Sequence, residues 1–282
     1  MEAVFGVVYS FILGAIVASF VNVVALRHGS GRTLMGRSKC MVCDTTLVWY
    51  DLVPVVSFIM LRARCRSCKS RLSFRYPIVE CLLGLIFALI ALRVGVSLDT
   101  AVFIVFQWVV WSVFVAIVLY DLQHKIIPDR FVVVLGILTF LFATVRFIVA
   151  PAGVSTTTLL FDTFAAGPII ALPFAIIWLV SGGRWMGLGD AKLAFSIGWL
   201  LGLSGGTASV LLSFWIGAFA GIGLILIPIV VNNLHRRRLP LRSPQLTMKS
   251  EIPFAPFLAL GALLVFLFDI NLTVLFELLA FR

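Results

Sequence analysis

Two carboxylates are the residues best suited to chemistry in this chain. Asp121 lies in the segment 118–129 (Val-Leu-Tyr-Asp-Leu-Gln-His-Lys-Ile-Ile-Pro-Asp), and Asp190 ends the motif Gly-Leu-Gly-Asp at 187–190. Each lies at the end of a long apolar run, in a chain with only 12 acidic residues among 282. A carboxylate at membrane depth is costly and usually faces a cavity where it has a function. Two carboxylates that share one proton can hydrolyse an amide without a metal or a covalent nucleophile, although the spacing alone fits two unrelated helix-end acids equally well.

The composition predicts an all-α polytopic membrane protein. The chain is 62% hydrophobic and 12% charged, which is outside the range of ordinary soluble domains. A helix of about 20 residues crosses the hydrocarbon core. We expect the first span to be retained rather than cleaved as a signal peptide, because Glu2 stands where a basic start would be. About eight transmembrane helices are predicted, near 4–26, 77–97, 100–120, 131–150, 158–180, 192–206, 208–231 and 255–280.

The basic residues predict the orientation of these spans. The net charge is +10, but its distribution indicates topology rather than nucleic-acid binding, so no nucleic-acid partner is expected. With the N-terminus outside, 19 of the 22 Lys and Arg residues fall in cytoplasmic segments, and only Arg93, Arg146 and Arg282 fall outside. This asymmetry follows the positive-inside rule. We expect the basic loops to contact anionic membrane lipids.

This topology places both aspartates at the cytoplasmic face. Pro128 favours a break just after the Asp121 segment, because proline cannot continue a hydrogen-bonded helix. Gly187 and Gly189 permit close backbone approach, or conformations closed to other residues, just before Asp190. Irregular backbone at that depth must line protein or water.

Four cysteines form a candidate metal site between the first two spans. Cys40 and Cys43 make one C-x2-C pair, Cys65 and Cys68 make another, and 21 residues separate the pairs. The pattern favours a structural zinc site. Two disulfides or four free thiols are the alternatives, and a cytoplasmic location disfavours disulfides. Cys81 is expected to be a buried apolar residue.

Together these motifs resemble the bacterial type IV prepilin peptidases, leader peptidases and N-methyltransferases of the Gly-x-Gly-Asp aspartyl protease family. The resemblance covers nearly the whole chain and departs from the family at Ala63, where Gly is usual, and at His28-Gly29, where Leu-Pro is common. It is carried by the segments 18–24 with Arg27, 36–40, the two cysteine pairs with Trp49-Tyr-Asp51, Pro54 and Ser57 between them, 71–77 with Glu80, 121–129 and 186–193.

The resemblance implies a bifunctional enzyme of the bacterial inner membrane. Such enzymes cut the basic leader from type IV prepilins or pseudopilins at the cytoplasmic face, here with Asp121 and Asp190 as the catalytic dyad. Many then methylate the new N-terminus with S-adenosylmethionine, and the four-cysteine domain goes with these members. The expected domains are a first transmembrane helix at 1–27, a zinc domain at 28–76 and a peptidase domain at 77–282.

The other polar residues have weaker predictions. Asp129 is expected to be an N-cap rather than a catalytic group, and His124 to be solvated. Lys192 is expected to pair with a carboxylate or a lipid phosphate. Glu80 is expected either to bind the leader or methyl donor or to favour a helix N-terminus. Asp44 and Asp51, with Glu80, are candidate acids for the basic leader, and Asp162, Asp269 and Glu277 are expected at interfaces near the opposite face.

Two other functions compete with this interpretation. A peptidase without methylation would keep the dyad alone. A proton-coupled membrane transporter would place its acids near the bilayer midplane, often beside paired half-helices. The sequence does not locate the methyl-donor site, assign acid and base within the dyad, or identify the pilin substrate or the oligomeric state.

Overall fold

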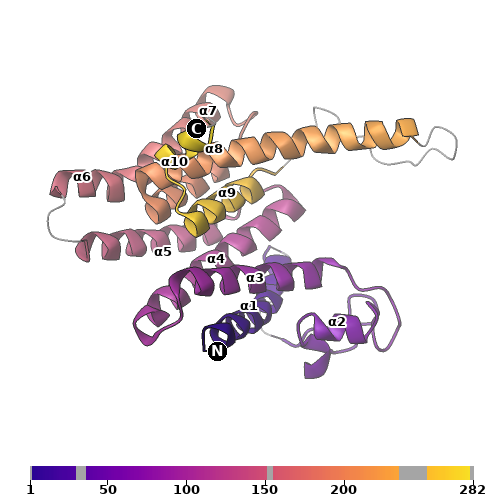
Figure 1. The fold of residues 1–282 in the computed structure, drawn as a ribbon. Helices are drawn as coiled ribbons and strands as arrows, with labels where there is room; N and C mark the ends of the chain where they lie inside the picture. Colours follow the sequence, from indigo (N-terminus) through magenta and orange to yellow (C-terminus); the bar gives the residue numbers. More distant parts are fainter. Residues whose placement is uncertain (1, 30–35, 151–154, 235–252, 280–282) are drawn as a thin grey trace. The chain divides into compact units, whose positions relative to one another are not determined.

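The computed structural model describes residues 2–29, 36–150, 155–234 and 253–279. Regular structure in these ranges is helical, as predicted, and the chain divides into two compact units, Met1–Tyr120 and Asp121–Arg282 (Figure 1). Each unit is described by itself. The helices are α1 (Glu2–Arg27), η1 (Trp49–Leu52), α2 (Val56–Met60), α3 (Arg75–Val94), α4 (Leu98–His124), α5 (Asp129–Ile148), α6 (Thr156–Leu160), η2 (Phe161–Ala165), α7 (Ala166–Ser181), α8 (Leu188–Leu234), α9 (Ala255–Phe268) and α10 (Leu272–Leu279).

In the first unit, α1 and α3 pack closely through small residues. A Cβ built on Gly14 would lie 2.8 Å from the Cα of Gly84, so larger residues at this crossing would force the helices apart. Such small-residue contacts let transmembrane helices approach when lipid offers no hydrophobic drive for association. The α4 helix joins them through Trp108, which stacks on Phe87 at 4.9 Å and donates its indole N–H to the Phe87 carbonyl.

In the second unit, α8 reverses direction at Gly202. This residue has φ +76° and ψ −177°. A Cβ on Gly206 would lie 3.3 Å from the Cα of Gly198, whereas eight residues of unbroken helix would separate these positions by about 12 Å. The element is therefore a helical hairpin, and its two arms correspond to the sixth and seventh predicted spans.

The remaining spans agree with the predictions except at the C-terminal end. Among the described residues, six helices are long and apolar enough to cross a membrane when α8 is taken as one. The hairpin in α8 and the shorter apolar α9 account for about eight crossing segments. The predicted span at 255–280 is broken, because Asp269 adopts a left-handed conformation with φ +51° between α9 and α10. The loop centred on Arg236–Arg238 lies outside the described residues.

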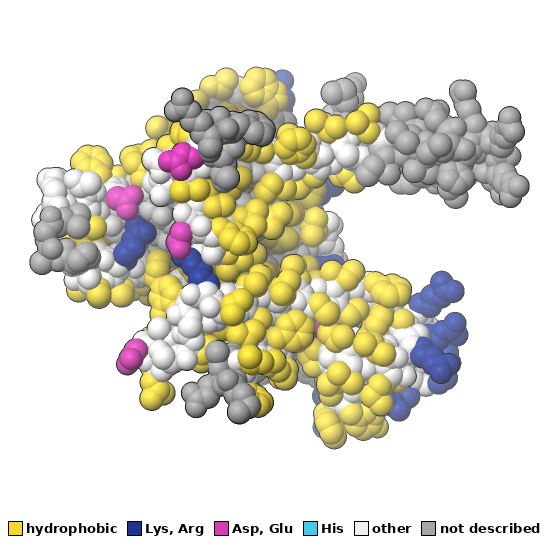
Figure 2. Space-filling view, viewed as in Figure 1, with side chains coloured by type: hydrophobic (Ala, Val, Ile, Leu, Met, Phe, Trp, Pro, Cys, Tyr) yellow, Lys and Arg dark blue, Asp and Glu magenta, His cyan; other side chains and the backbone are white. Residues whose placement is uncertain are grey.

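Figure 2 shows hydrophobic side chains covering most of the visible helical surface. Lys and Arg side chains gather over the loop domain that carries α2 in the first unit (Figure 2). Cys81, expected to be buried, is exposed on α3, and because α3 is a candidate span its thiol lies on an apolar helix surface.

Candidate active site and metal centre

The second unit brings the two predicted catalytic carboxylates together. Asp121 and Asp190 are 4% and 9% exposed, and their carboxyl groups interact electrostatically. The backbone N–H of Ala255 is directed at Asp121, and that of Gly187 is directed at Asp190. The Asp121 Oδ2 atom is buried without a hydrogen-bond partner among the described residues. A buried, unpaired carboxylate oxygen beside a second carboxylate is an arrangement able to bind and activate a water molecule.

Both carboxylates are positioned by helix ends. The α4 helix ends three residues after Asp121, where Lys125 has φ +55° and its N–H still bonds to the Asp121 carbonyl at 2.7 Å. Pro128 then precedes α5 in extended conformation, which is the predicted break. Asp190 is the third residue of α8, so it lies within the first helical turn rather than before it.

The two glycines of the Gly-Leu-Gly-Asp motif have different environments. A Cβ on Gly189 would lie 2.8 Å from the Cβ of Ile127, so glycine is needed for the start of α8 to touch the loop after Asp121. At Gly187 the nearest atom, Asp190 Oδ2, would be 3.7 Å away, and its φ is not in the left-handed region. Only Gly189 therefore has the close backbone approach that the sequence suggested for both.

Asp129 is not an N-cap. Pro128 occupies the N-cap position of α5, and Asp129, the first helical residue, forms an ion pair with Lys192. This confirms the carboxylate partner expected for Lys192. Both side chains are well exposed, so the pair contributes little stability. His124 is exposed, as expected.

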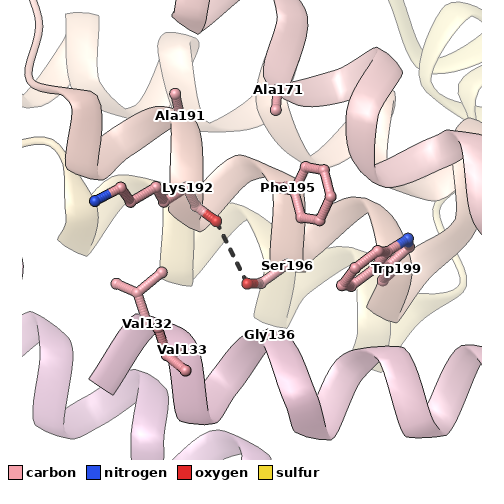
Figure 3. A pocket seen from close by; sticks show the side chains of 9 residues that line it. All are labelled: Val132, Val133, Gly136, Ala171, Ala191, Lys192, Phe195, Ser196 and Trp199. Atoms are coloured by element: carbon pink, nitrogen blue, oxygen red, sulfur yellow. Dashed lines mark hydrogen bonds between the residues drawn. The ribbon is translucent and has the colours of Figure 1, made fainter. Parts of the chain in front are cut away.

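A cavity of about 330 Å³ lies beside this ion pair, between α5, α7 and α8 (Figure 3). Its α8 wall is formed by Ala191, Lys192, Phe195, Ser196 and Trp199. With about 100° of rotation per residue, the last four of these positions lie on the side of α8 opposite Asp190. The cavity is therefore not the cleft of the carboxylate pair.

Asp162, one of the acids predicted to lie at an interface, bonds to the backbone of the α8 hairpin. Asp162, in η2, accepts a hydrogen bond from the Leu203 N–H at 2.9 Å and lies 3.7 Å from the Arg146 guanidinium. Leu203 begins the second arm of the α8 hairpin, so Asp162 caps a helix to which it does not belong. Glu277 is exposed on α10.

In the first unit, the four predicted metal ligands converge. The Sγ atoms of Cys40, Cys43, Cys65 and Cys68 all lie within 4.8 Å of one another, and Cys40 and Cys68 are 3.8 Å apart. Zinc bonds of about 2.3 Å in a tetrahedron place the sulfurs about 3.8 Å apart. The cluster therefore fits a tetrahedral metal site, and all four cysteines are free thiols in the structure.

The metal site is built from a repeated turn that the sequence analysis missed. In residues 38–47, the N–H of Cys40 bonds to the Thr45 carbonyl. In residues 63–72, the N–H of Cys65 bonds to the Ser70 carbonyl in the same way. The residues after each pair, Asp44 and Lys69, both have positive φ. The aligned segments Ser-Lys-Cys-Met-Val-Cys-Asp-Thr-Thr-Leu and Ala-Arg-Cys-Arg-Ser-Cys-Lys-Ser-Arg-Leu carried this signal.

The repeat also directs backbone N–H groups at the first sulfur of each pair. Those of Cys43 and Val42 lower the pKa of the Cys40 thiol to about 6. Those of Cys68 and Ser67 are directed at Cys65. Metal ions bind the thiolate form, so this turn prepares Cys40 for ligation.

Two of the three acids suggested for leader binding are engaged elsewhere. Asp51 accepts hydrogen bonds from Arg66 at 2.7 and 3.0 Å. Glu80 is 7% exposed and lies beyond the first turn of α3, so it neither serves the helix N-terminus nor faces solvent. Asp44 is exposed and remains a candidate for contact with a basic peptide.

Comparison with known proteins identifies two family regions. Residues 12–94 match the bacterial peptidase A24 N-terminal domain, and residues 108–222 match the type IV leader peptidase family. A prepilin leader peptidase/N-methyltransferase of Bacillus subtilis (strain 168) is 30% identical over 263 residues, which cover 92% of each chain. Enzymes of the same description from Aeromonas hydrophila (29%, covering 85% of this chain and 74% of the relative) and Pseudomonas putida (27%, covering 93% and 90%) are also similar. No solved structure matches the chain.

Proposed function

This chain belongs to the family of type IV prepilin leader peptidase/N-methyltransferases, and we propose that it cleaves the leader of prepilins or pseudopilins and methylates the new N-terminus. The observation that carries the peptidase proposal is the buried pair of Asp121 and Asp190 within one compact unit. The family resemblance and the pair agree on the same chemistry, which is amide hydrolysis by two carboxylates.

In the proposed reaction one carboxylate acts as base and the other as acid. The base takes a proton from water as the water oxygen attacks the scissile carbonyl carbon. The acid donates its proton to the amide nitrogen as the carbon–nitrogen bond breaks, which leaves a new amine on the pilin and a carboxylate on the leader. Asp121, whose Oδ2 atom has no partner among the described residues, and Asp190 fill these roles as a coupled pair.

We propose a cytoplasmic active site in a bacterial inner-membrane protein with its N-terminus outside. The two spans between Asp121 and Asp190, α5 and α6–α7, return the chain to the same face. The hairpin at Gly202 supports this orientation, because it preserves the alternation that sends the basic segment after α8 to that face as well. A prepilin carries one apolar helix, so it would approach within the bilayer with its leader near those loops. Bilayer lipids are the other partners.

The metal cluster supports a structural zinc ion held by Cys40, Cys43, Cys65 and Cys68. Zinc with four thiolate ligands has no open coordination position and stabilises a small loop domain with little core of its own. We assign methyl transfer from S-adenosylmethionine to the region of this domain, 28–76, and peptide cleavage to 77–282.

The transporter alternative lacks support in the geometry. Asp121 lies three residues from the end of α4 and Asp190 lies in the first turn of α8. A proton-coupled transporter would place its acids near the middle of the spans. Cleavage without methylation remains the closer alternative.

One assay tests both activities. The purified protein is incubated with a prepilin and S-adenosylmethionine, and the products are analysed by mass spectrometry. We expect loss of the leader followed by a gain of one methyl group on the pilin N-terminus. Uncut prepilin would contradict the peptidase proposal, and cut but unmethylated pilin would establish a peptidase alone.

A further inference from the structure

Glu80 is a buried acid that neither metal ligation nor peptide hydrolysis uses. Its Oε2 atom accepts the backbone N–H of Val55 at 2.8 Å, and the Ser19 side chain also bonds to it. These partners come from the cysteine-containing loop domain and from α1, while Glu80 itself lies on α3 (Figure 1). Within the described residues it forms no ion pair. A buried carboxylate without a cation carries a large desolvation cost.

The backbone is strained at Val55, the residue that makes this contact. Val55 has φ +60° and ψ −49°, and a β-branched residue in that region is a genuine outlier. Such strain persists only where the surroundings enforce it, most often at functional sites. The loop between the two cysteine pairs is therefore shaped to place the Val55 N–H on Glu80.

Asn22 adds unused hydrogen-bonding groups to the same end of α1. It lies three residues after Ser19, so the two share one side of the helix. Asn22 is 1% exposed, and both its amide oxygen and its amide nitrogen lack hydrogen-bond partners among the described residues. Buried polar groups are nearly always paired, so an orphaned amide on the same side of α1 as Ser19, which bonds to the uncompensated Glu80 carboxylate, points to a site for a polar ligand.

The charges select the class of that ligand. Asp51, an acid of the loop domain whose side chain is 5% exposed, is paired with Arg66, whereas Glu80 on α3 has no such cation. A carboxylate with an amide donor and acceptor beside it suits an organic cation, such as an ammonium or a sulfonium group. S-Adenosylmethionine carries both groups, and it is the methyl donor of the proposed function.

We propose that Glu80 and Asn22, with Ser19, form the subsite that holds the cationic part of the methyl donor in the first unit. This inference rests on the proposed methyl transfer. The Val55 contact explains why the four-cysteine domain accompanies methylation, because the metal-stabilised loop completes the wall of the subsite. The subsite belongs to a different compact unit from the carboxylate pair, so its loss leaves the peptidase groups in place.

Equilibrium dialysis of labelled S-adenosylmethionine against the purified full-length protein tests the subsite without requiring catalysis. We expect Glu80→Gln to weaken donor binding at least 10-fold and Asn22→Leu to weaken it about 5-fold, from loss of a charged and a neutral partner respectively. Asp51→Asn, which removes the loop-domain acid that is already paired with Arg66, is the matched control and should bind the donor as the wild type does. Zinc content and prepilin cleavage at wild-type levels would show that each variant is folded.

The outcomes separate the subsite from the function. If the wild type binds the donor and Glu80→Gln binds it equally well, the subsite is overturned while methylation stands. If the wild type binds no donor, the proposed methyl transfer is contradicted, and so is the subsite. Should Glu80→Gln not fold, Asn22→Leu and Ser19→Ala are tested instead, and unchanged donor binding in both variants would overturn the proposal.

S-Adenosylhomocysteine, which lacks the sulfonium charge, is the second probe. A Glu80→Gln defect confined to S-adenosylmethionine places Glu80 at the sulfonium, and an equal defect with both compounds places it at the ammonium.

Discussion

Gly189 touches the loop that follows the other catalytic segment, because a Cβ at position 189 would lie 2.8 Å from the Cβ of Ile127. This contact joins the start of α8, which carries Asp190, to the chain that leaves α4 just after Asp121. The distance between the two carboxylates therefore depends on the absence of a side chain at residue 189. A displacement of about 1 Å at catalytic groups can cost about 100-fold in rate.

Gly189→Ala should lower prepilin cleavage about 10-fold to 100-fold, because the methyl group must push Ile127 and α8 apart. Cleavage rates of purified variants with comparable thermal stability measure this effect. Gly187→Ala is the matched control, since its Cβ would find 3.7 Å of space, and we expect less than about 3-fold loss for a substitution without overpacking.

A compensating substitution makes the same test sharper. Ile127→Gly removes the Cβ atom that Gly189→Ala would meet at 2.8 Å, so the double variant should recover activity relative to Gly189→Ala alone. Non-additivity of this kind is expected of residues in contact. Additive losses in the double variant would show that the Gly189–Ile127 contact does not control the site.

The purified protein should contain one zinc ion per chain, measured by elemental mass spectrometry. Because the two cysteine turns are structurally equivalent, Cys43→Ser and Cys68→Ser should each abolish the bound zinc to a similar degree. Cys81→Ser is the control, since that thiol is exposed on α3 and distant in sequence from both turns. Full zinc occupancy in Cys43→Ser would contradict a four-thiolate site.

Ala63→Gly should stabilise the metal domain by about 1 kcal/mol, because Ala63 has φ +57° and left-handed backbone costs a non-glycine residue about 1–2 kcal/mol. Zinc retention against a competing chelator reports the change, since metal binding and folding of such domains are coupled. Ala88→Gly, in the middle of α3, should instead destabilise the protein by about 1 kcal/mol. Faster zinc loss from Ala63→Gly would show that the turn has no strain to relieve.

The α8 hairpin should depend on Asp162 and Gly202. Removing the cap with Asp162→Ala should cost about 1 kcal/mol in unfolding free energy, and Gly202→Ala should cost more, because its Cβ would lie 2.9 Å from the Asp162 carboxylate at a φ of +76°. Denaturation in detergent micelles measures both. Asp99→Ala, at the exposed start of α4, is the control and should change stability by less than about 0.5 kcal/mol. Equal effects of Asp162→Ala and Asp99→Ala would remove the capping role.

The sequence predicted the parts of the fold that depend on hydrophobicity and charge. The spans, the break near Pro128 and the four-cysteine cluster follow from apolar length, proline chemistry and cysteine spacing. The structure agrees with them except in the last span, which is broken at Asp269. The predictions from sequence failed for side chains whose role is set by a partner distant in the sequence. Asp129 was expected to cap its own helix but pairs with Lys192 from α8. Asp162 caps a helix about 40 residues away, and no local pattern signals that contact.

The cysteine turns show a different limit. Their spacing predicted the four-cysteine cluster, and the aligned segments share only the cysteines and a final leucine, which is a weak signal of the repeat. The backbone hydrogen bonds establish that the two turns are equivalent. Val55 and Glu80 likewise come from separate motifs of the family resemblance, and only the fold brings them within 2.8 Å.

The measurement that tests the central claim most directly is prepilin cleavage by Asp121→Asn and Asp190→Asn. Each substitution keeps the shape of the side chain and removes the carboxylate, so each should lower the cleavage rate by about 100-fold to 10,000-fold, the usual contribution of a general acid or base. Asp129→Asn, which removes a nearby exposed carboxylate, should cleave at close to the wild-type rate. Full cleavage by either Asp121→Asn or Asp190→Asn, in protein that folds and binds zinc normally, would contradict the dyad.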